Sequence, residues 1–154
     1  MAQNGLYKST DGGANWNQSN AGLPNGYNGR RDVQAIAIDP TTPSTLYASV
    51  HYFPEIGYSV TQVYKSNDAG MSWSFSSSGV GGLFDLAIDP VTTGTVYAAT
   101  DTGVYKTVDG ATWHPTALNR GIVYAVALDP TTPSTVYAGA VRFPTSAFVT
   151  KISP

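Results

Sequence analysis

Four acidic residues lie outside the repeated motifs of this sequence and could carry acid–base chemistry: Asp32, Glu55, Asp85 and Asp101. Two carboxyl groups about 5–9.5 Å apart can hydrolyse a glycosidic bond, one as the acid and the other as the nucleophile or base. Asp32 and Asp85 are the candidate pair, because both lie near the starts of equivalent strands and could face a common channel. Alternatively, both are solvated or turn carboxylates without a catalytic role.

Other kinds of site receive less support. The chain has no cysteine, and its two histidines are far apart in the sequence, so we expect no metal site and no cofactor. The net charge is −2 and the basic residues are scattered, which disfavours nucleic acid or an anionic membrane as a partner. No run approaches the roughly 18 apolar residues of a membrane span. Only 12% of the residues are charged, which is common in exported bacterial and archaeal proteins and favours an extracellular or periplasmic location.

An internal repeat indicates which strands and loops of the fold hold these residues. An alternating apolar run that ends in Asp-Pro occurs at Asp39, Asp89 and Asp129, and each is followed by Leu-Tyr-Ala or Val-Tyr-Ala. The first two copies are 50 residues apart and the last two are 40 apart. This period is typical of four-stranded blades of a β-propeller.

A second motif alternates with the first. It contains Ser or Thr, then Asp, Gly and Trp, and it occurs over residues 9–16, 66–73 and 107–113. It resembles the Asp-box, or bacterial neuraminidase repeat, and the whole pattern is most similar to the xyloglucanase, photosystem II assembly factor and sortilin-like branches of that family. The third copy departs from the motif, because Thr107 replaces Ser and one residue is missing before Trp113. The resemblance implies a propeller fold and leaves function open, because the family includes enzymes, receptors and assembly factors.

The motif residues have structural roles by default. The Asp can accept backbone hydrogen bonds within the turn, the Gly permits positive φ, and the Trp anchors the next strand in the core. We therefore assign structural roles to six residues: Asp11, Trp16, Asp68, Trp73, Asp109 and Trp113.

The chain is predicted to be an all-β single module spanning residues 1–154. Alternation predicts four antiparallel strands per blade, which in the first complete blade are A (33–38), B (45–50), C (63–66) and D (from Trp73). The order along the chain is strands C–D (1–18), a blade (33–78), a second blade (83–118), then strands A, B and a degenerate C (123–154). This arrangement gives about three blades.

Length differences between the repeats identify a candidate functional face. The insertions all fall in B–C or D–A connections, which share one face of a blade whose strands alternate in direction. Loops that vary on a fixed scaffold are where binding is usually built. The candidate binding residues on this face are Tyr27, Arg30, Arg31, Tyr52, Phe53, Asp85, Arg142 and Phe143. Their Tyr, Phe and Arg side chains suit a glycan or protein ligand, although ordinary loop packing is the alternative.

The half-blades at the two ends predict assembly. Propellers typically close with 4–8 blades, so three blades would leave exposed sheet edges. We expect the module to be completed by copies of itself, in a closed ring or a filament, or by the rest of a longer propeller. The sequence thus favours a non-catalytic binding or assembly module, with a xyloglucanase-like hydrolase fragment using Asp32 and Asp85 as the alternative.

Overall fold

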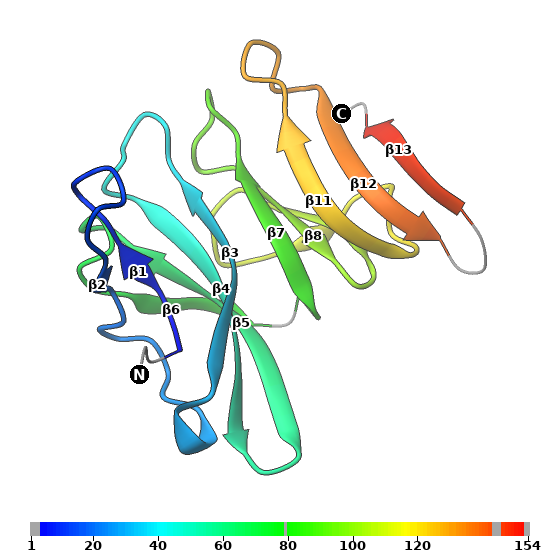
Figure 1. The fold of residues 1–154 in the computed structure, drawn as a ribbon. Helices are drawn as coiled ribbons and strands as arrows, with labels where there is room; N and C mark the ends of the chain where they lie inside the picture. The colour runs from blue at the N-terminus through cyan, green and yellow to red at the C-terminus, as the bar shows by residue number, and fades with distance from the viewer. Residues whose placement is uncertain (1–3, 79, 143–145, 153–154) are drawn as a thin grey trace.

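The computed structural model describes residues 4–78, 80–142 and 146–152, which form an all-β array (Figure 1). The described residues make thirteen strands and one short 3-10 turn, η1 (Tyr27–Gly29). The strands are β1 (Tyr7–Lys8), β2 (Asn17–Gln18), β3 (Arg31–Ile38), β4 (Leu46–Glu55), β5 (Tyr58–Ser66), β6 (Ser74–Ser78), β7 (Leu83–Ile88), β8 (Val96–Thr100), β9 (Gly103–Thr107), β10 (His114–Pro115), β11 (Ile122–Leu128), β12 (Val136–Arg142) and β13 (Ser146–Ile152).

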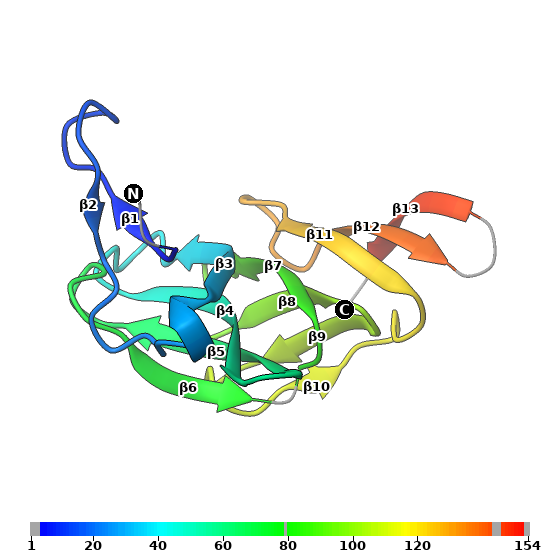
Figure 2. The same cartoon turned by 60° about the horizontal axis from the view of Figure 1, so that its bottom comes forward.

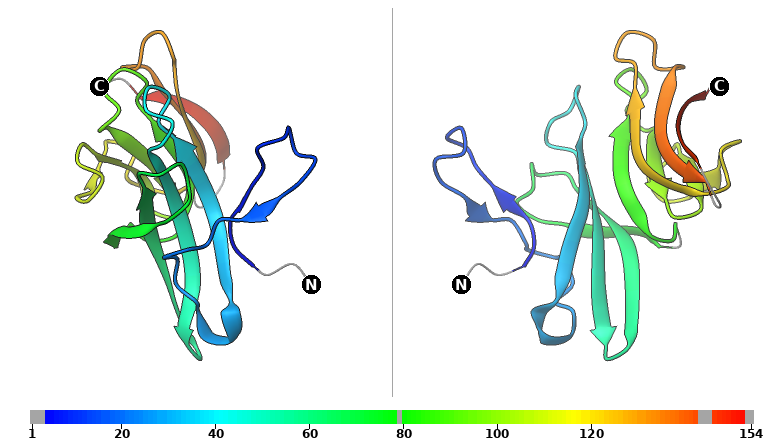
Figure 3. Two further views of the ribbon diagram at one scale, coloured as in Figure 1. Left: turned by 90° about the vertical axis from the view of Figure 1, so that its left-hand side faces the viewer. Right: turned by 45° about the vertical axis from the view of Figure 1, so that its right-hand side comes forward.

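The strands form four antiparallel sheets whose order follows the sequence. β3-β4-β5-β6 and β7-β8-β9-β10 are complete four-stranded blades, named here the first and second blades. β11-β12-β13 is a three-stranded third blade, and β1-β2 is a separate two-stranded hairpin. The views in Figures 2 and 3 show the three blades stacked face to face, with β1-β2 beside the first blade. The predicted fold class is confirmed, including the start at strand C and the end after strands A, B and C.

The inserted residues between strands B and C differ from the prediction, because they extend the strands instead of forming a loop. In the first blade, His51 pairs with Thr61 and Tyr52 with Val60, so the β4–β5 hairpin continues well beyond the expected end at residue 50. The alternating and β-branched residues of this segment suit a strand on both sides of the hairpin. In the third blade, β12 pairs with β13 from Val136 to Arg142, so the degenerate strand C is also longer than the expected 148–152.

Each blade has two apolar faces, and neighbouring blades pack through them. We name the face toward the preceding blade the leading face and the face toward the following blade the trailing face. Ala35, Ala37, Tyr47 and Val63 on the trailing face of the first blade pack against Leu86, Val96 and Ala98 on the leading face of the second. The same arrangement joins the second and third blades: Tyr97, Ala99 and Val104 pack against Val126, Val136 and Ala138. Two-residue alternation along each strand creates both faces.

Three Ser/Thr-x-Asp turns connect strands C and D. In the second of them, Asp68 Oδ1 accepts hydrogen bonds from the Ser66 hydroxyl at 2.8 Å and from the Ser72 backbone N–H at 2.8 Å. In the third, which is one residue shorter, Asp109 accepts from the N–H groups of Ala111 and Thr112, both at 2.8 Å. In the short turn, the Asp carboxylate therefore accepts from the backbone N–H groups two and three residues after it, as predicted. In the longer turn, it accepts from the N–H group four residues after it.

These hydrogen bonds stabilise the ionised carboxylates. The Asn15 and Ser9 donors lower the pKa of Asp11 to about 2, and the Ser72 and Ser66 donors lower that of Asp68 to about 2, from an ordinary value of 3.8. Backbone donors also lower the pKa of Asp109. Because the folded-state pKa values are depressed, the contribution to stability is present above pH 3.8 and is lost as the pH falls toward 2.

The three tryptophans differ in burial. Trp73 is 4% exposed, and its Nε1 donates to the Ser19 carbonyl at 2.9 Å, while Trp113 donates to Ser77 Oγ at 2.7 Å. In both cases the acceptor comes from the segment that precedes the blade, after β2 for Trp73 and in β6 for Trp113. Trp16 is 62% exposed, which contradicts its predicted anchoring in the core. The described chain places no preceding strand beside β1-β2, so the same motif has no surface to pack against.

We predict that Trp73→Ala lowers the free energy of unfolding by about 3–5 kcal/mol, the usual cost of truncating a buried large aromatic side chain. Trp16→Ala is the matched control and should change it by at most about 0.5 kcal/mol, as expected for an exposed side chain. Chemical denaturation of both variants measures the difference. Equal effects would contradict the assignment of Trp73 to the core.

Candidate functional site

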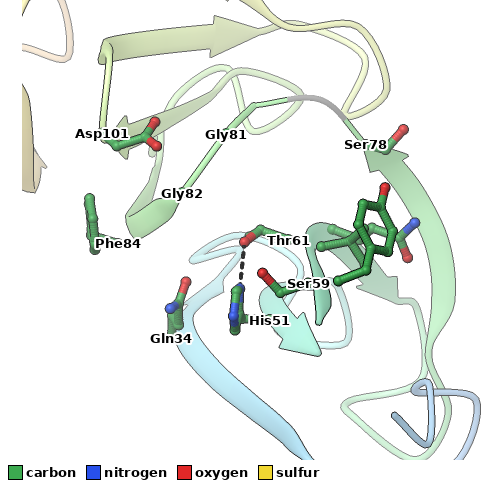
Figure 4. A pocket seen from close by; sticks show the side chains of 12 residues that line it. Gln34, His51, Ser59, Thr61, Ser78, Gly81, Gly82, Phe84 and Asp101 are labelled. Atoms are coloured by element: carbon green, nitrogen blue, oxygen red, sulfur yellow. Dashed lines mark hydrogen bonds between the residues drawn. The ribbon is translucent and has the colours of Figure 1, made fainter. Parts of the chain in front are cut away.

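A cavity of about 700 Å³ lies between the first and second blades, beside the extended β4–β5 hairpin (Figure 4). It is on the face that carries the B–C and D–A connections, which is where the sequence places the functional surface. The lining residues are mostly polar: Gln34, His51, Tyr58, Ser59, Val60, Thr61, Gln62, Ser78, Gly81, Gly82, Phe84 and Asp101.

The backbone of the second blade positions a carboxylate of this cavity, that of Asp101. Asp101 follows β8, and its N–H donates to the Gly82 carbonyl at 2.9 Å. Its side chain lies over Gly81 and Gly82, where a Cβ on Gly81 would be 2.5 Å from Asp101 Oδ1. Gly81 also has φ of +70°, a conformation that favours glycine. The two glycines thus leave room for the carboxylate at the mouth of the cavity.

Hydrogen bonds along the β4–β5 hairpin orient the opposite wall. His51 Nδ1 lies 3.0 Å from Thr61 Oγ1, its partner across the hairpin. On the other face of the hairpin, away from the second blade, Gln62 Oε1 accepts hydrogen bonds from the hydroxyls of Tyr52 at 3.1 Å and Tyr64 at 3.0 Å. Burial, with a smaller contribution from Tyr52, raises the pKa of Tyr64 to about 12, so its hydroxyl remains a donor at neutral pH. The side of the hairpin that faces the cavity therefore presents the hydroxyls of Ser59 and Thr61 and the His51 ring.

Asp85, one member of the candidate catalytic pair, links two blades. Its Oδ1 accepts from its neighbour Leu86 N–H at 2.9 Å, and its Oδ2 accepts from Val126 N–H in β11 at 3.0 Å. Both carboxylate oxygens are thus occupied by backbone donors. Asp32 is exposed on β3, and neither Asp32 nor Asp85 lines the cavity. The arrangement gives Asp85 a structural role as a bridge from the second blade to the third.

Arg31 is also occupied within the fold. Its side chain is 7% exposed. Its Nε donates to the Asn4 carbonyl, and its Nη1 donates to the Pro24 carbonyl and to Asn25 Oδ1, each at 3.0 Å. The guanidinium therefore holds the segment before β1 and the segment before η1 against β3. The sequence predicted Arg31 in a connection and assigned it to ligand contact, whereas Arg31 is the first residue of β3 and its side chain bonds to other parts of the chain.

Two other predicted binding residues, Arg30 and Phe53, form a cluster with His51 on the extended β4–β5 hairpin. The guanidinium of Arg30 lies 4.8 Å from the ring centre of Phe53, and His51 meets the same ring edge-on at 5.3 Å. Tyr27 is exposed in η1, whereas Tyr52 packs with the core cluster of the first blade. Phe143 and the Arg142 side chain lie outside the described parts of the chain.

Sequence reasoning missed several residues of the cavity wall: Gln34, Ser59, Thr61 and Gln62. The signal was present in the alternation of residues 58–66, which would have extended strand C and placed Thr61 opposite His51. Reading the insertion as a loop hid this pairing.

Within the described residues, no group of three or more His, Cys, Asp or Glu side chains is arranged to hold a metal ion. Among the same residues, there is no helix of the length and apolarity that a membrane crossing needs.

Comparison with known proteins adds evidence on the fold. No protein-family model matches the chain, and no curated protein matches it. An ancestral GH74 enzyme is similar in structure, with a TM-score of 0.60 and 20% identity over 79% of this chain and 19% of that one. The GH74 xyloglucanase from Xanthomonas campestris is similar with a TM-score of 0.58 and 18% identity, covering 77% of this chain and 22% of that one. A third structure, YCF48 from Cyanidioschyzon merolae, has a TM-score of only 0.39 and 13% identity, covering 79% of this chain and 56% of that one.

The chain thus spans about a fifth of the length of the two GH74 structures. At this identity the likeness concerns the fold alone. Together with the sheet order, it shows that the chain consists of β-propeller blades.

We predict that Asp85→Ala lowers the free energy of unfolding by about 1–3 kcal/mol, because it leaves backbone N–H groups without their charged acceptor. Asp32→Ala, at the other candidate carboxylate, should have little effect because Asp32 is exposed. Thermal and denaturant unfolding of the two variants provide the comparison. If both variants were equally stable, the bridge from Asp85 to β11 would not hold the blades together.

Proposed function

We propose that this chain is a non-catalytic binding and assembly module, made of Asp-box propeller blades whose open faces are covered by a partner chain. The face with the B–C and D–A connections is its recognition surface. The observation that carries the proposal is that residues equivalent to the internal blade–blade interface are exposed at both ends of the array.

The leading face of the first blade is partly uncovered. Ile36 and Ile38 are 47% and 56% exposed. The residues at the same repeat position as Ile36 are Leu86 and Val126, and these are only 6% and 5% exposed because a preceding blade covers them. The exposed isoleucines therefore mark a packing face without its partner.

The trailing face of the third blade is uncovered in the complementary way. Tyr137 is 44% exposed, whereas its repeat equivalents Tyr47 and Tyr97 are 2% and 7% exposed. Ala125 and Ala127 are exposed as well, and their equivalents in the first blade, Ala35 and Ala37, are buried. This end presents the same Ala and Tyr side chains that cover a leading face inside the chain.

We infer that the partner is a second copy, docked head to tail. Inside the chain, the Tyr47 hydroxyl lies so close to Gly110 that a Cβ there would be 2.6 Å from it. Gly70 occupies the equivalent place in the preceding turn: its carbonyl accepts from Ser19 Oγ as that of Gly110 accepts from Ser76 Oγ. Tyr137 of a neighbouring copy would then lie over Gly70, and its Ala125 and Ala127 would cover Ile36 and Ile38.

The N-terminal residues are consistent with this docking. Ser19 contacts the Gly70 turn as strand D of a preceding blade would, and Leu6 and Leu23 cover part of the leading face. They occupy the outer part of a preceding blade and leave the inner part open. β13 of the incoming copy and β1 would both take the position of strand C, so β1 must displace β13 or pair beside it.

The test uses two variants that each block one face, Ile36→Lys and Ala127→Lys. Light scattering should show self-association of the unmodified chain and monomers for each variant alone. A mixture of the two variants should form a complex with one copy of each, because one intact leading face and one intact trailing face remain.

Val91→Lys is the matched control, since Val91 is 74% exposed on the turn before β8, away from both faces. It should associate like the unmodified chain. An unmodified chain that stays monomeric at high micromolar concentration would overturn the second-copy proposal, as would a mixture that forms no complex.

A glycoside hydrolase fragment is the second candidate function, because the motif pattern resembles that of xyloglucanases and the two GH74 proteins share the fold of this chain. Against it, both oxygens of the Asp85 carboxylate accept backbone hydrogen bonds. We predict no hydrolysis of xyloglucan, other β-glucans or sialosides in a reducing-sugar assay. Turnover that is abolished by Asp85→Asn and retained in Asp11→Asn would instead establish the hydrolase.

The composition supports an extracellular or periplasmic site of action, which we include in the proposal. The chain is rich in uncharged polar residues, and 12% of it is charged. Fractionation of cells that produce the chain from its native gene would test this location.

A further inference from the structure

We propose that the cavity between the first and second blades binds an organic cation, an ammonium group carried by a lysine side chain or a small amine. This inference rests on the proposed role of the face as a recognition surface and gives the chemical class of its ligand. The juxtaposition that carries it is a carboxylate, an aromatic ring and a wall of neutral oxygen acceptors around one cavity.

The cavity is built from positions that the repeat does not need for folding. Phe84 and Gln34 occupy one repeat position, five residues before the Asp-Pro turn, and Asp101 and His51 occupy another, twelve residues after it. The third blade has Tyr124 and Val141 at these two positions. Most packing positions, in contrast, hold closely similar residues in all three blades, with Asp85 at the place of Ala35 and Ala125 as the exception. The cavity residues therefore vary within a scaffold that stays the same.

The charged residues around the cavity favour a cationic ligand. Among the described residues that line it, Asp101 is the only acidic one, and none is Lys or Arg. No hydrogen bond joins the Asp101 carboxylate to another described residue, so both of its oxygens remain available to a ligand. A carboxylate that faces an open cavity without a basic neighbour attracts a cation and repels an anion.

The remaining walls suit an ammonium group on an alkyl stem. Phe84 lies on the same side as Asp101 (Figure 4), and Tyr124 supports its ring at a centroid distance of 5.2 Å. An aromatic face attracts a cation through its quadrupole and also packs against methylene groups. Across the cavity, the hydroxyls of Ser59 and Thr61 offer acceptors for the remaining N–H groups.

The experiment titrates the ¹⁵N-labelled chain with three probes and follows the backbone resonances of Gly81, Gly82 and Asp101. Nα-acetyl-lysine methylamide and n-butylammonium carry the cation, and Nα-acetyl-norleucine methylamide is the stem without it. We expect saturable shifts with both cations, weakening with added salt, and none with norleucine. A tighter response to the lysine probe than to butylammonium would indicate a peptide as the source of the group.

Two variants and a control make the test specific. Asp101→Asn should weaken binding of the lysine probe about fivefold, the upper range for an exposed ion pair, and Phe84→Leu should weaken it by a similar factor. Glu55→Gln is the control. It removes an exposed carboxylate of the β4–β5 hairpin that does not line the cavity, and it should leave binding unchanged. Equal shifts with the norleucine probe, or no response to either cation, would overturn the proposal.

A neutral disaccharide, cellobiose, separates this inference from the broader role of the face. Shifts at the same residues with cellobiose and none with the cations would overturn the cation proposal while retaining recognition by this surface. The oligomer experiment is independent of both results, because Ile36 and Ala127 lie outside the cavity.

Discussion

The contact between the trailing face of one sheet and the leading face of the next is the interaction on which the whole array depends. Small Ala side chains and one Tyr on the trailing face meet branched side chains on the leading face, and this pairing occurs at both internal junctions. Alanine lets the sheets approach closely, while Leu and Val fill the space between them. A single four-stranded sheet has two apolar faces and cannot bury both by itself, so blades are stable only in a stack.

This dependence explains the features at the ends of the array. Trp73 is buried because residues of the β2 region lie against it, while Trp16, in an equivalent motif, is exposed. Ile36 and Tyr137 are exposed for the same reason, since each has the side chain of a junction without the opposing sheet. The chemistry of these residues is that of an interface, and the assembly proposal follows from this constraint.

The cavity depends on the same contact in a different way. Its two walls belong to different blades, so the distance between Asp101 and the β4–β5 hairpin is set by how the blades pack. The bridge from Asp85 to β11 acts at the next junction and fixes the second blade against the third. A rigid junction on each side of Phe84 and Asp101 would keep the carboxylate and the ring in place without a ligand.

The sequence by itself determined the blades, because the Asp-Pro and Ser/Thr-x-Asp turns and the two-residue alternation are local signals. Short-range hydrogen bonds, such as those to Asp68 and Asp109, can be inferred from residue type and spacing. Only the tertiary structure decided whether a single side chain is buried, exposed or hydrogen-bonded. Arg31 and Asp85 looked available for a ligand, but each is hydrogen-bonded within the chain, including to one distant backbone group, of Asn4 and Val126 respectively. The exposure of Trp16 was also decided there, because burial depends on which sheet lies opposite, and that sheet is not encoded within the motif.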